Sequence, residues 1–136
     1  MFNDLMSKKT QVLWGLVVFL ILVAVDQLAK ILCGNVYHNF FFAFSLKVPA
    51  PLMYVVYFIG IASIAAYLFK HHQNLSKTDF LAWTMILAGA VSNVGERIVL
   101  GYVRDWIHIK SGVFNLADGY IILGILILLI GNIRKK

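Results

Sequence analysis

The chain has 136 residues, of which 61% are hydrophobic and 13% are charged, with a formal net charge of +6. A soluble domain carries roughly 25% charged residues, so a chain this apolar needs lipid as a second solvent. Its length leaves room for a single membrane domain, residues 1–136, and most basic residues lie just outside apolar runs, which favours membrane anchoring over a nucleic-acid partner.

Four apolar runs are long enough to cross a bilayer, which takes roughly 20 residues per helix. They cover about 12–31, 52–69, 80–97 and 116–133. The third run is continuously apolar only to Val94, and it extends further if polar residues are tolerated on one face. These runs predict an all-α integral membrane protein with four transmembrane helices.

The first run has a rival interpretation as a signal peptide, because Lys8 and Lys9 precede an apolar stretch. No small-x-small cleavage site follows, Lys30 interrupts the pattern, and the residues before Cys33 do not form a lipoprotein-type cleavage box. We therefore expect the run to remain as a helix. As the single cysteine, Cys33 excludes an intrachain disulfide and a cysteine-pair metal site.

Polar residues occur near the end of the first run and along the third. Asp26 and Lys30 are four residues apart on one helix face, where they could form an interfacial ion pair with a snorkelling lysine. Asn93, Glu96 and Arg97 share one stripe of the third run. The last two could neutralise one another, or the stripe could position a partner carboxylate.

Two aspartates, Asp105 and Asp118, bracket the polar hairpin between the last two runs. Acids are costly next to hydrocarbon, and when present they usually line a site or a pathway. Asn115 and Asp118 also have the spacing of a helix N-cap and a first-turn acid, so capping alone could explain one of them. A pair of acids at one membrane face predicts shared proton chemistry, as in a membrane aspartic peptidase.

Lysine and arginine counts orient the chain. With both termini inside, seven of these residues lie on the cytoplasmic side and four on the other. The outer membrane boundary then holds Asp26, Asn39, Asn93, Arg97, Asp105, Asn115 and Asp118. Capping explains one of these residues and snorkelling explains another, but neither explains all of them.

Five segments resemble the sequence boxes of lipoprotein signal peptidase (signal peptidase II), a family of bacterial membrane aspartic proteases. Residues 26–30, Asp-Gln-Leu-Ala-Lys, are similar to the first box, and residues 39–45 to the second, Asn-x-Gly-x-Ala-Phe-Ser. Residues 92–97 resemble the third, Gly-Asn-x-x-Asp-Arg. Residues 101–106 and 114–118 resemble the two boxes that hold the catalytic aspartates, so the boxes occur in family order over most of the chain.

The resemblance implies that Asp105 and Asp118 share one proton and act together on a bound water. It implies supporting or substrate-binding roles for Asp26, Lys30, Asn39, Asn93, Arg97 and Asn115. No cofactor or metal is implied, and His38 with His108 makes a poor ligand set. The implied substrate is a prolipoprotein with a diacylglyceryl cysteine, cut just before that cysteine.

The resemblance also implies a monomer in contact with membrane lipids of the bacterial inner membrane. Both termini would be cytoplasmic, and the active site would lie near the extracytoplasmic face. There the family has a small strand platform and a lid helix. The connectors in this chain are short, so we expect a trimmed platform, for which short β-strands are one option.

Three positions depart from the family pattern: Phe41 and Ser92 stand for glycines, and Glu96 stands for an aspartate. These departures leave an inactive or repurposed member of the family as an alternative. A small four-helix proton-coupled transporter is the other class. It fits less well, because Asp26 lies late in its run and the two aspartates around the hairpin would have no role.

Overall fold

The computed structural model describes residues 8–41 and 46–134. Its elements are α1 (Lys8–Leu32), β1 (Tyr37–Asn39), α2 (Ala50–His71), α3 (Lys77–Leu100), β2 (Val103–Asp105), β3 (Ile107–Ile109), β4 (Gly112–Phe114) and α4 (Leu116–Arg134). All four expected helices are present, with bounds close to the predicted ones. Residues 42–45 of the second sequence box lie outside the described residues, as do the last two lysines of the chain.

Among the described residues, three helical segments are long and apolar enough to cross a membrane, judged by length and composition. They are Lys9–Leu32, Ala50–His71 and Leu116–Arg134. α3 does not belong to this set, because charged and amide side chains lie near both of its ends: Lys77 and Asp79 at the start, and Asn93, Glu96 and Arg97 near the finish. The prediction of a mainly helical membrane protein is therefore confirmed, whereas the crossing of the membrane by α3 stays a prediction.

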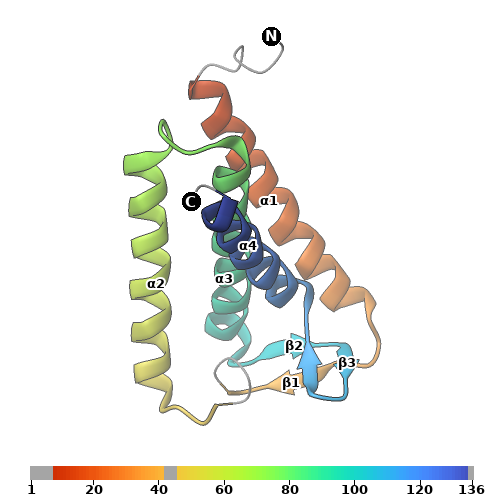
Figure 1. Cartoon of the computed structure of the whole chain (residues 1–136). Coiled ribbons are helices and arrows are strands. Elements are labelled where there is room, and N and C mark those ends of the chain that lie inside the picture. Colours follow the sequence, from red (N-terminus) through yellow and green to blue (C-terminus); the bar gives the residue numbers. More distant parts are fainter. Residues whose placement is uncertain (1–7, 42–45, 135–136) are drawn as a thin grey trace.

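α3 lies between α1 and α2, and α4 crosses in front of it (Figure 1). It packs against all three other helices, most extensively against α4. Two glycines permit this close approach: a Cβ at Gly89 would lie 2.4 Å from the carbonyl oxygen of Ala117, and one at Gly124 would lie 2.6 Å from that of Ala82. Small residues let helix backbones meet in this way within membranes.

α2 packs less tightly than the other helices. It buries Met53 against the rest of the molecule, but most of its side chains are exposed or half-exposed. Its main neighbour is α3, and it stands apart from α1 in Figure 1. Among the described residues, the side of α3 that faces α2 is thus covered by a helix with few buried side chains.

The strands form two small antiparallel sheets at one end of the helices (Figure 1). β1 pairs with β2, with Tyr37 opposite Asp105, and β3 pairs with β4, with Ile107 opposite Phe114. The chain enters β2 through Gly101, which ends α3 at φ 82°, a left-handed conformation that favours glycine. The expected platform of short strands is therefore present.

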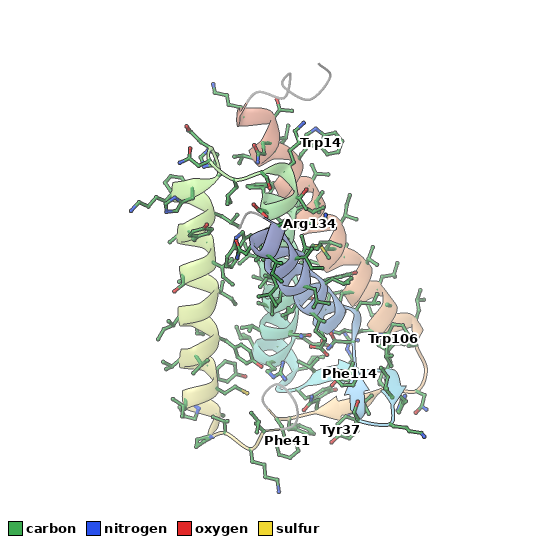
Figure 2. All side chains as sticks on the ribbon, viewed as in Figure 1. Trp14, Tyr37, Phe41, Trp106, Phe114 and Arg134 are labelled. Carbon is green, nitrogen blue, oxygen red and sulfur yellow. The ribbon has the colours of Figure 1, made fainter. Side chains whose placement is uncertain are left out.

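Aromatic side chains gather at the strand end of the molecule. Figure 2 shows Tyr37, Phe41, Trp106 and Phe114 there, and Trp14 towards the opposite end of the helices. Aromatic rings at both ends of a helical bundle are typical of the two membrane–water interfaces.

Candidate active site

Asp118 lies in the first turn of α4, and Asn115 caps that helix. The backbone N–H of Asp118 donates to Asn115 Oδ1 at 2.9 Å, and the backbone N–H of Asn115 donates to Asp118 Oδ2 at 3.1 Å. These reciprocal bonds form a capping box, as the spacing predicted. The cap leaves the other oxygen of Asp118 to accept from Asn93 Nδ2 at 2.9 Å. Capping and membership of a larger polar cluster are therefore compatible.

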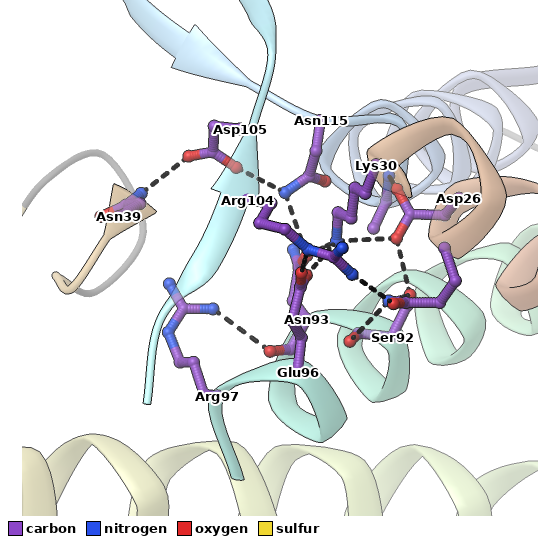
Figure 3. Close-up of polar contacts among 12 residues, drawn as sticks. Asp26, Lys30, Asn39, Ser92, Asn93, Glu96, Arg97, Arg104, Asp105 and Asn115 are labelled. Atoms are coloured by element: carbon purple, nitrogen blue, oxygen red, sulfur yellow. Dashed lines mark hydrogen bonds and ion pairs between the residues drawn. The ribbon is translucent and has the colours of Figure 1, made fainter. Parts of the chain in front are cut away.

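Asp105 is the last residue of β2, and its side chain is almost completely buried. Its carboxylate accepts from Asn39 Nδ2 at 2.9 Å and from Asn115 Nδ2 at 2.7 Å. Figure 3 shows both contacts. Asn115 thus binds the carboxylate of Asp105 with its side chain and forms the cap with Asp118.

Burial raises the pKa of Asp105 above its ordinary value of 3.8, because a carboxylate loses hydration there. The side-chain amides of Asn39 and Asn115 counteract this effect in part, since they donate to the charged form. The negative charge of Asp118 raises the pKa further. The net direction of the shift in the pKa of Asp105 is upward.

Both aspartates line one cavity of about 280 Å³. Four other predicted site residues line it as well: Asn39, Asn93, Arg97 and Asn115. The remaining wall includes Tyr57 of α2 and the apolar side chains Val103, Phe114, Ile121 and Ile122. A concave, largely apolar site with a few convergent polar groups is the usual form of a binding pocket.

Asp26 and Lys30 do not line this cavity but lie buried behind it. Lys30 Nζ lies 2.8 Å from Asp26 Oδ2, and both side chains are 0% exposed. The expected ion pair is present, but the snorkelling interpretation is wrong because Lys30 points inward, donating to Asn93 Oδ1 at 3.1 Å. Asp26 Oδ1 accepts from the backbone N–H of Ala117 at 3.0 Å, next to Asp118. The pair therefore connects α1 to α3 and to the start of α4.

Arg97 is held from several elements. Its Nη2 donates to the carbonyl oxygen of Phe41 at 2.7 Å, and its guanidinium lies 5.4 Å from the ring centroid of Tyr57. The hydroxyl of Tyr54 donates to the carbonyl oxygen of Arg97 at 3.1 Å. Glu96 and Arg97 do not neutralise one another, because Glu96 pairs with Lys30 and Arg104. Arg97 instead joins α3 to α2 and to the segment after β1.

Several residues in this region had no predicted role. Arg104 Nε pairs with Glu96 Oε1, and Arg104 Nη2 donates to Gln27 Oε1 at 3.2 Å. The sequence feature that could have identified Arg104 is its position next to Asp105. Neighbouring residues of a strand point to opposite faces, so Arg104 could contact groups on the face away from Asp105. The signal for Tyr54 and Tyr57 was their spacing of three on an otherwise apolar helix, which puts both polar tips on one face.

The predicted absence of a metal site concerns the histidines near the strands. The ring of His38 stacks on that of Tyr102 with centroids 4.2 Å apart, and His108 Nδ1 lies 3.0 Å from the carbonyl oxygen of Trp106. The described part of the chain holds no group of three or more His, Cys, Asp or Glu side chains that could bind a metal ion.

Comparison with known proteins identifies relatives of this chain. The family model described as Signal peptidase (SPase) II matches residues 18–134. The lipoprotein signal peptidase of Streptococcus agalactiae serotype V is 27% identical over 141 residues, covering 88% of this chain and 92% of that protein. The lipoprotein signal peptidase of Streptococcus pyogenes serotype M1 is 31% identical over 132 residues, covering 82% and 87%.

Solved structures have the same fold. One, described as a bacterial membrane enzyme structure at 2.3 Å resolution, has a TM-score of 0.76 at 19% identity and covers 88% of this chain and 87% of its own. A second such structure, at 1.9 Å resolution, has a TM-score of 0.75 at 18% identity. At these identities the likeness concerns the fold alone.

Proposed function

Because the chain belongs to the signal peptidase II family, we propose that it is an aspartic endopeptidase that uses Asp105 and Asp118 to cleave prolipoproteins. The family makes it a membrane protease of the lipoprotein signal peptidase type. One observation carries the assignment of the pair: both carboxylates line the same cavity. The contacts of Asn115 with both residues support it.

In the proposed mechanism the two carboxyls share one proton, since two close carboxylates cannot both ionise cheaply. Asp118 is the base, because the N-terminus of α4 favours an anion. It takes a proton from water as the water oxygen attacks the scissile carbonyl carbon. Asp105, to which we assign the shared proton, donates a hydrogen bond to the carbonyl oxygen. When the C–N bond breaks, the leaving amine takes up a proton from the pair.

The other cavity residues fit supporting roles. Asn39, Asn93 and Asn115 donate to the two carboxylates and hold their orientation. Arg97 contributes to the cavity wall, and its Nε is a buried donor without a hydrogen-bond partner among the described residues. We assign this donor to a backbone carbonyl of the substrate, because a buried unpaired donor is costly until a ligand satisfies it.

The proposed substrate is a prolipoprotein whose cysteine carries diacylglycerol, and the cut falls just before that cysteine. Its signal helix would enter from the bilayer beside α2, where packing is loose and Tyr57 forms the cavity wall. Ile121 and Ile122 add apolar wall on α4, which suits an apolar signal helix. No cofactor takes part in this scheme.

The proposed topology places the whole chain, residues 1–136, in the bacterial inner membrane as one domain. All four helices cross the membrane, with both termini cytoplasmic and the cavity near the extracytoplasmic face. α3 can cross in spite of its polar residues, because other helices cover much of its surface. Both aspartates come from one chain, so a monomer surrounded by membrane lipids suffices.

The test is cleavage of a diacylglyceryl-modified prolipoprotein by the purified protein in detergent. Asp105→Asn and Asp118→Asn should each lower kcat by about 10³-fold or more, because the two residues act as a unit. Asp79→Asn is the matched control, since Asp79 lies in the first turn of α3 and the cavity is lined by residues of the other half of that helix. The same prolipoprotein without diacylglycerol tests the requirement for the lipid.

Each outcome has a clear meaning. Loss of cleavage in both folded variants, with the Asp79 variant still active, supports the proposal. Cleavage that survives either substitution would exclude the two-aspartate mechanism. A parent protein that does not cleave would indicate an inactive or repurposed member of the family.

A further inference from the structure

Behind the cavity, polar side chains of α1, α3 and β2 form a closed circuit of ion pairs and hydrogen bonds, much of which Figure 3 shows. We call it the buried ring. Its members are Asp26, Gln27, Lys30, Ser92, Glu96 and Arg104.

Three of the six contacts that close the buried ring are ion pairs. Lys30 Nζ lies 2.8 Å from Asp26 Oδ2 and 2.8 Å from Glu96 Oε2. The other carboxylate oxygen of Glu96 pairs with Arg104 Nε. Glu96 therefore joins a lysine of α1 to an arginine of β2.

Neutral side chains complete the circuit. Arg104 Nη2 donates to Gln27 Oε1 at 3.2 Å, and Gln27 Nε2 donates to Ser92 Oγ at 2.9 Å. Ser92 Oγ in turn donates to Asp26 Oδ2 at 2.6 Å, which closes the ring. Two of the three departures from the family pattern, Ser92 and Glu96, thus take part in it. The longer side chain of Glu96 contacts both cations at once.

The buried ring contains two acids and two bases, so their formal charges balance. The side chains of Asp26, Lys30 and Glu96 are at most 1% exposed, whereas that of Arg104 is 21% exposed. Buried charges are tolerated when they are paired, as here, and removal of one partner leaves another uncompensated. Arg104 is therefore the most accessible point at which to open the ring.

The buried ring is connected to both aspartates of the proposed pair. Arg104 directly precedes Asp105 in β2, so a contact that fixes Arg104 fixes the strand that carries Asp105. Lys30 donates to Asn93 Oδ1, and Asn93 Nδ2 donates to Asp118 Oδ1. Movement within the ring would thus displace both carboxylates.

Pairing between strands does not by itself hold Asp105 in place. In the described part of the chain, β2 pairs with β1 alone, and each strand has three residues. A two-stranded pair this short is weak. The polar contacts of Arg104 with α1 and α3 supply the missing directional attachment.

We infer that Arg104 is a positioning residue, which holds Asp105 in register with Asp118 by binding Glu96 and Gln27. This inference rests on the proposed function. Arg104 does not line the cavity, so its effect is on the placement of the reacting groups and not on substrate binding.

The test compares kcat and KM of Arg104 variants on the diacylglyceryl-modified prolipoprotein in detergent. Arg104→Gln should lower kcat about 10- to 100-fold, because small misplacement of reacting groups costs rate, and should change KM less than about threefold. Arg104→Lys should recover part of kcat, since it retains the charge but lacks the fork that binds two acceptors. Lys110→Gln makes the same charge change at an exposed position between β3 and β4 and should behave as the parent.

A second variant keeps the test decisive if Arg104→Gln does not fold. Glu96→Gln combined with Arg104→Gln removes one acid and one base, so the formal charges of the buried ring still balance. It should fold and show the same loss of kcat. Parent-like kcat in whichever of these two variants folds would overturn the inference while the proposed function stands. A parent protein that does not cleave, or an Asp105→Asn variant that does, would instead overturn the proposed function.

Discussion

Asn39 offers a way to change the electrostatics of Asp105 without altering either aspartate. Its Nδ2 donates to Asp105 at 2.9 Å, and its Oδ1 accepts from the backbone N–H of Phe41 at 3.0 Å. The donated bond favours the ionised carboxyl and so lowers the pKa of Asp105. Asn39 therefore opposes the effect of burial, and its removal should let burial dominate.

We expect Asn39→Ala to move the alkaline limb of the pH–kcat profile to higher pH. The reason is that the pKa of Asp105 rises when the donor is lost, so its proton is retained to higher pH. The control is Asn35→Ala, which changes an exposed asparagine between α1 and β1 and should leave the profile unchanged. An unmoved limb, or one at lower pH, would contradict the assignment of the proton to Asp105. Because the pair titrates as a unit, the limb reports a property of the dyad.

The same raised pKa predicts a pH-dependent stability. A carboxyl whose pKa is raised on folding stabilises the folded state fully below its ordinary pKa of 3.8. This contribution is lost as pH rises through the higher pKa of the folded protein. Relative to the parent, Asp105→Asn should therefore gain Tm as pH rises from about 4 to about 8, since asparagine has no proton to lose. A Tm difference that stays constant over this range would argue against the raised pKa.

Residue types could be predicted to belong to the site, but their partners could not. Asp105, Asp118 and Asn115 stood out because polar groups are rare in an apolar chain. The stripe position of Glu96 was also predictable, yet its partner was not, because pairing depends on how far α1 and β2 lie from α3. Arg97, its neighbour in sequence, instead has its guanidinium over the ring of Tyr57 on α2.

At the scale of elements, the α3–α4 contact should be the packing most sensitive to added volume. Gly89→Ala would place a methyl group 2.4 Å from the carbonyl oxygen of Ala117, and Gly124→Ala would place one 2.6 Å from that of Ala82. Overpacking of this kind costs about 1–3 kcal/mol. Both substitutions should lower Tm in detergent.

The two glycine variants should differ in activity. Gly89 contacts the turn that carries Asp118, so Gly89→Ala should also lower kcat, whereas Gly124→Ala should retain it. Gly60→Ala on α2 is the control, because its added methyl group meets nothing within 4 Å. Equal Tm for all three variants would show that α3 and α4 are not in the close contact described.

Helices and strands differed in how well the sequence predicted them. The helices follow from apolar runs of bilayer length, and their bounds were close to those observed. The strands have three residues each, which is too short for an alternating pattern to be recognised. β1 and β2 are also far apart in sequence, so only the tertiary fold brings Asn39 to Asp105.

At the scale of the whole molecule, Cys33 tests the proposed orientation. It is the one cysteine of the sequence, is half-exposed and follows α1 at the strand end. A membrane-impermeant maleimide should therefore label the parent from the extracytoplasmic side. Cys33→Ser combined with Asn74→Cys moves the thiol to the exposed turn before α3, and labelling should then require permeabilised membranes. The reverse pattern would invert the topology.

The polarity of α3 also bears on how the protein is made. α1 precedes α3 in the chain, so in the proposed topology Lys30 enters the bilayer before Glu96. In the proposed topology, a nascent α3 by itself would carry Glu96 into hydrocarbon without the two cations that it contacts in the folded protein, which is expensive. Beside α1, however, Glu96 meets a base on arrival, with Arg104 following shortly afterwards. In the proposed topology, insertion of α3 is therefore assisted by α1, because Lys30 of α1 is already in place to neutralise Glu96 when α3 enters the bilayer.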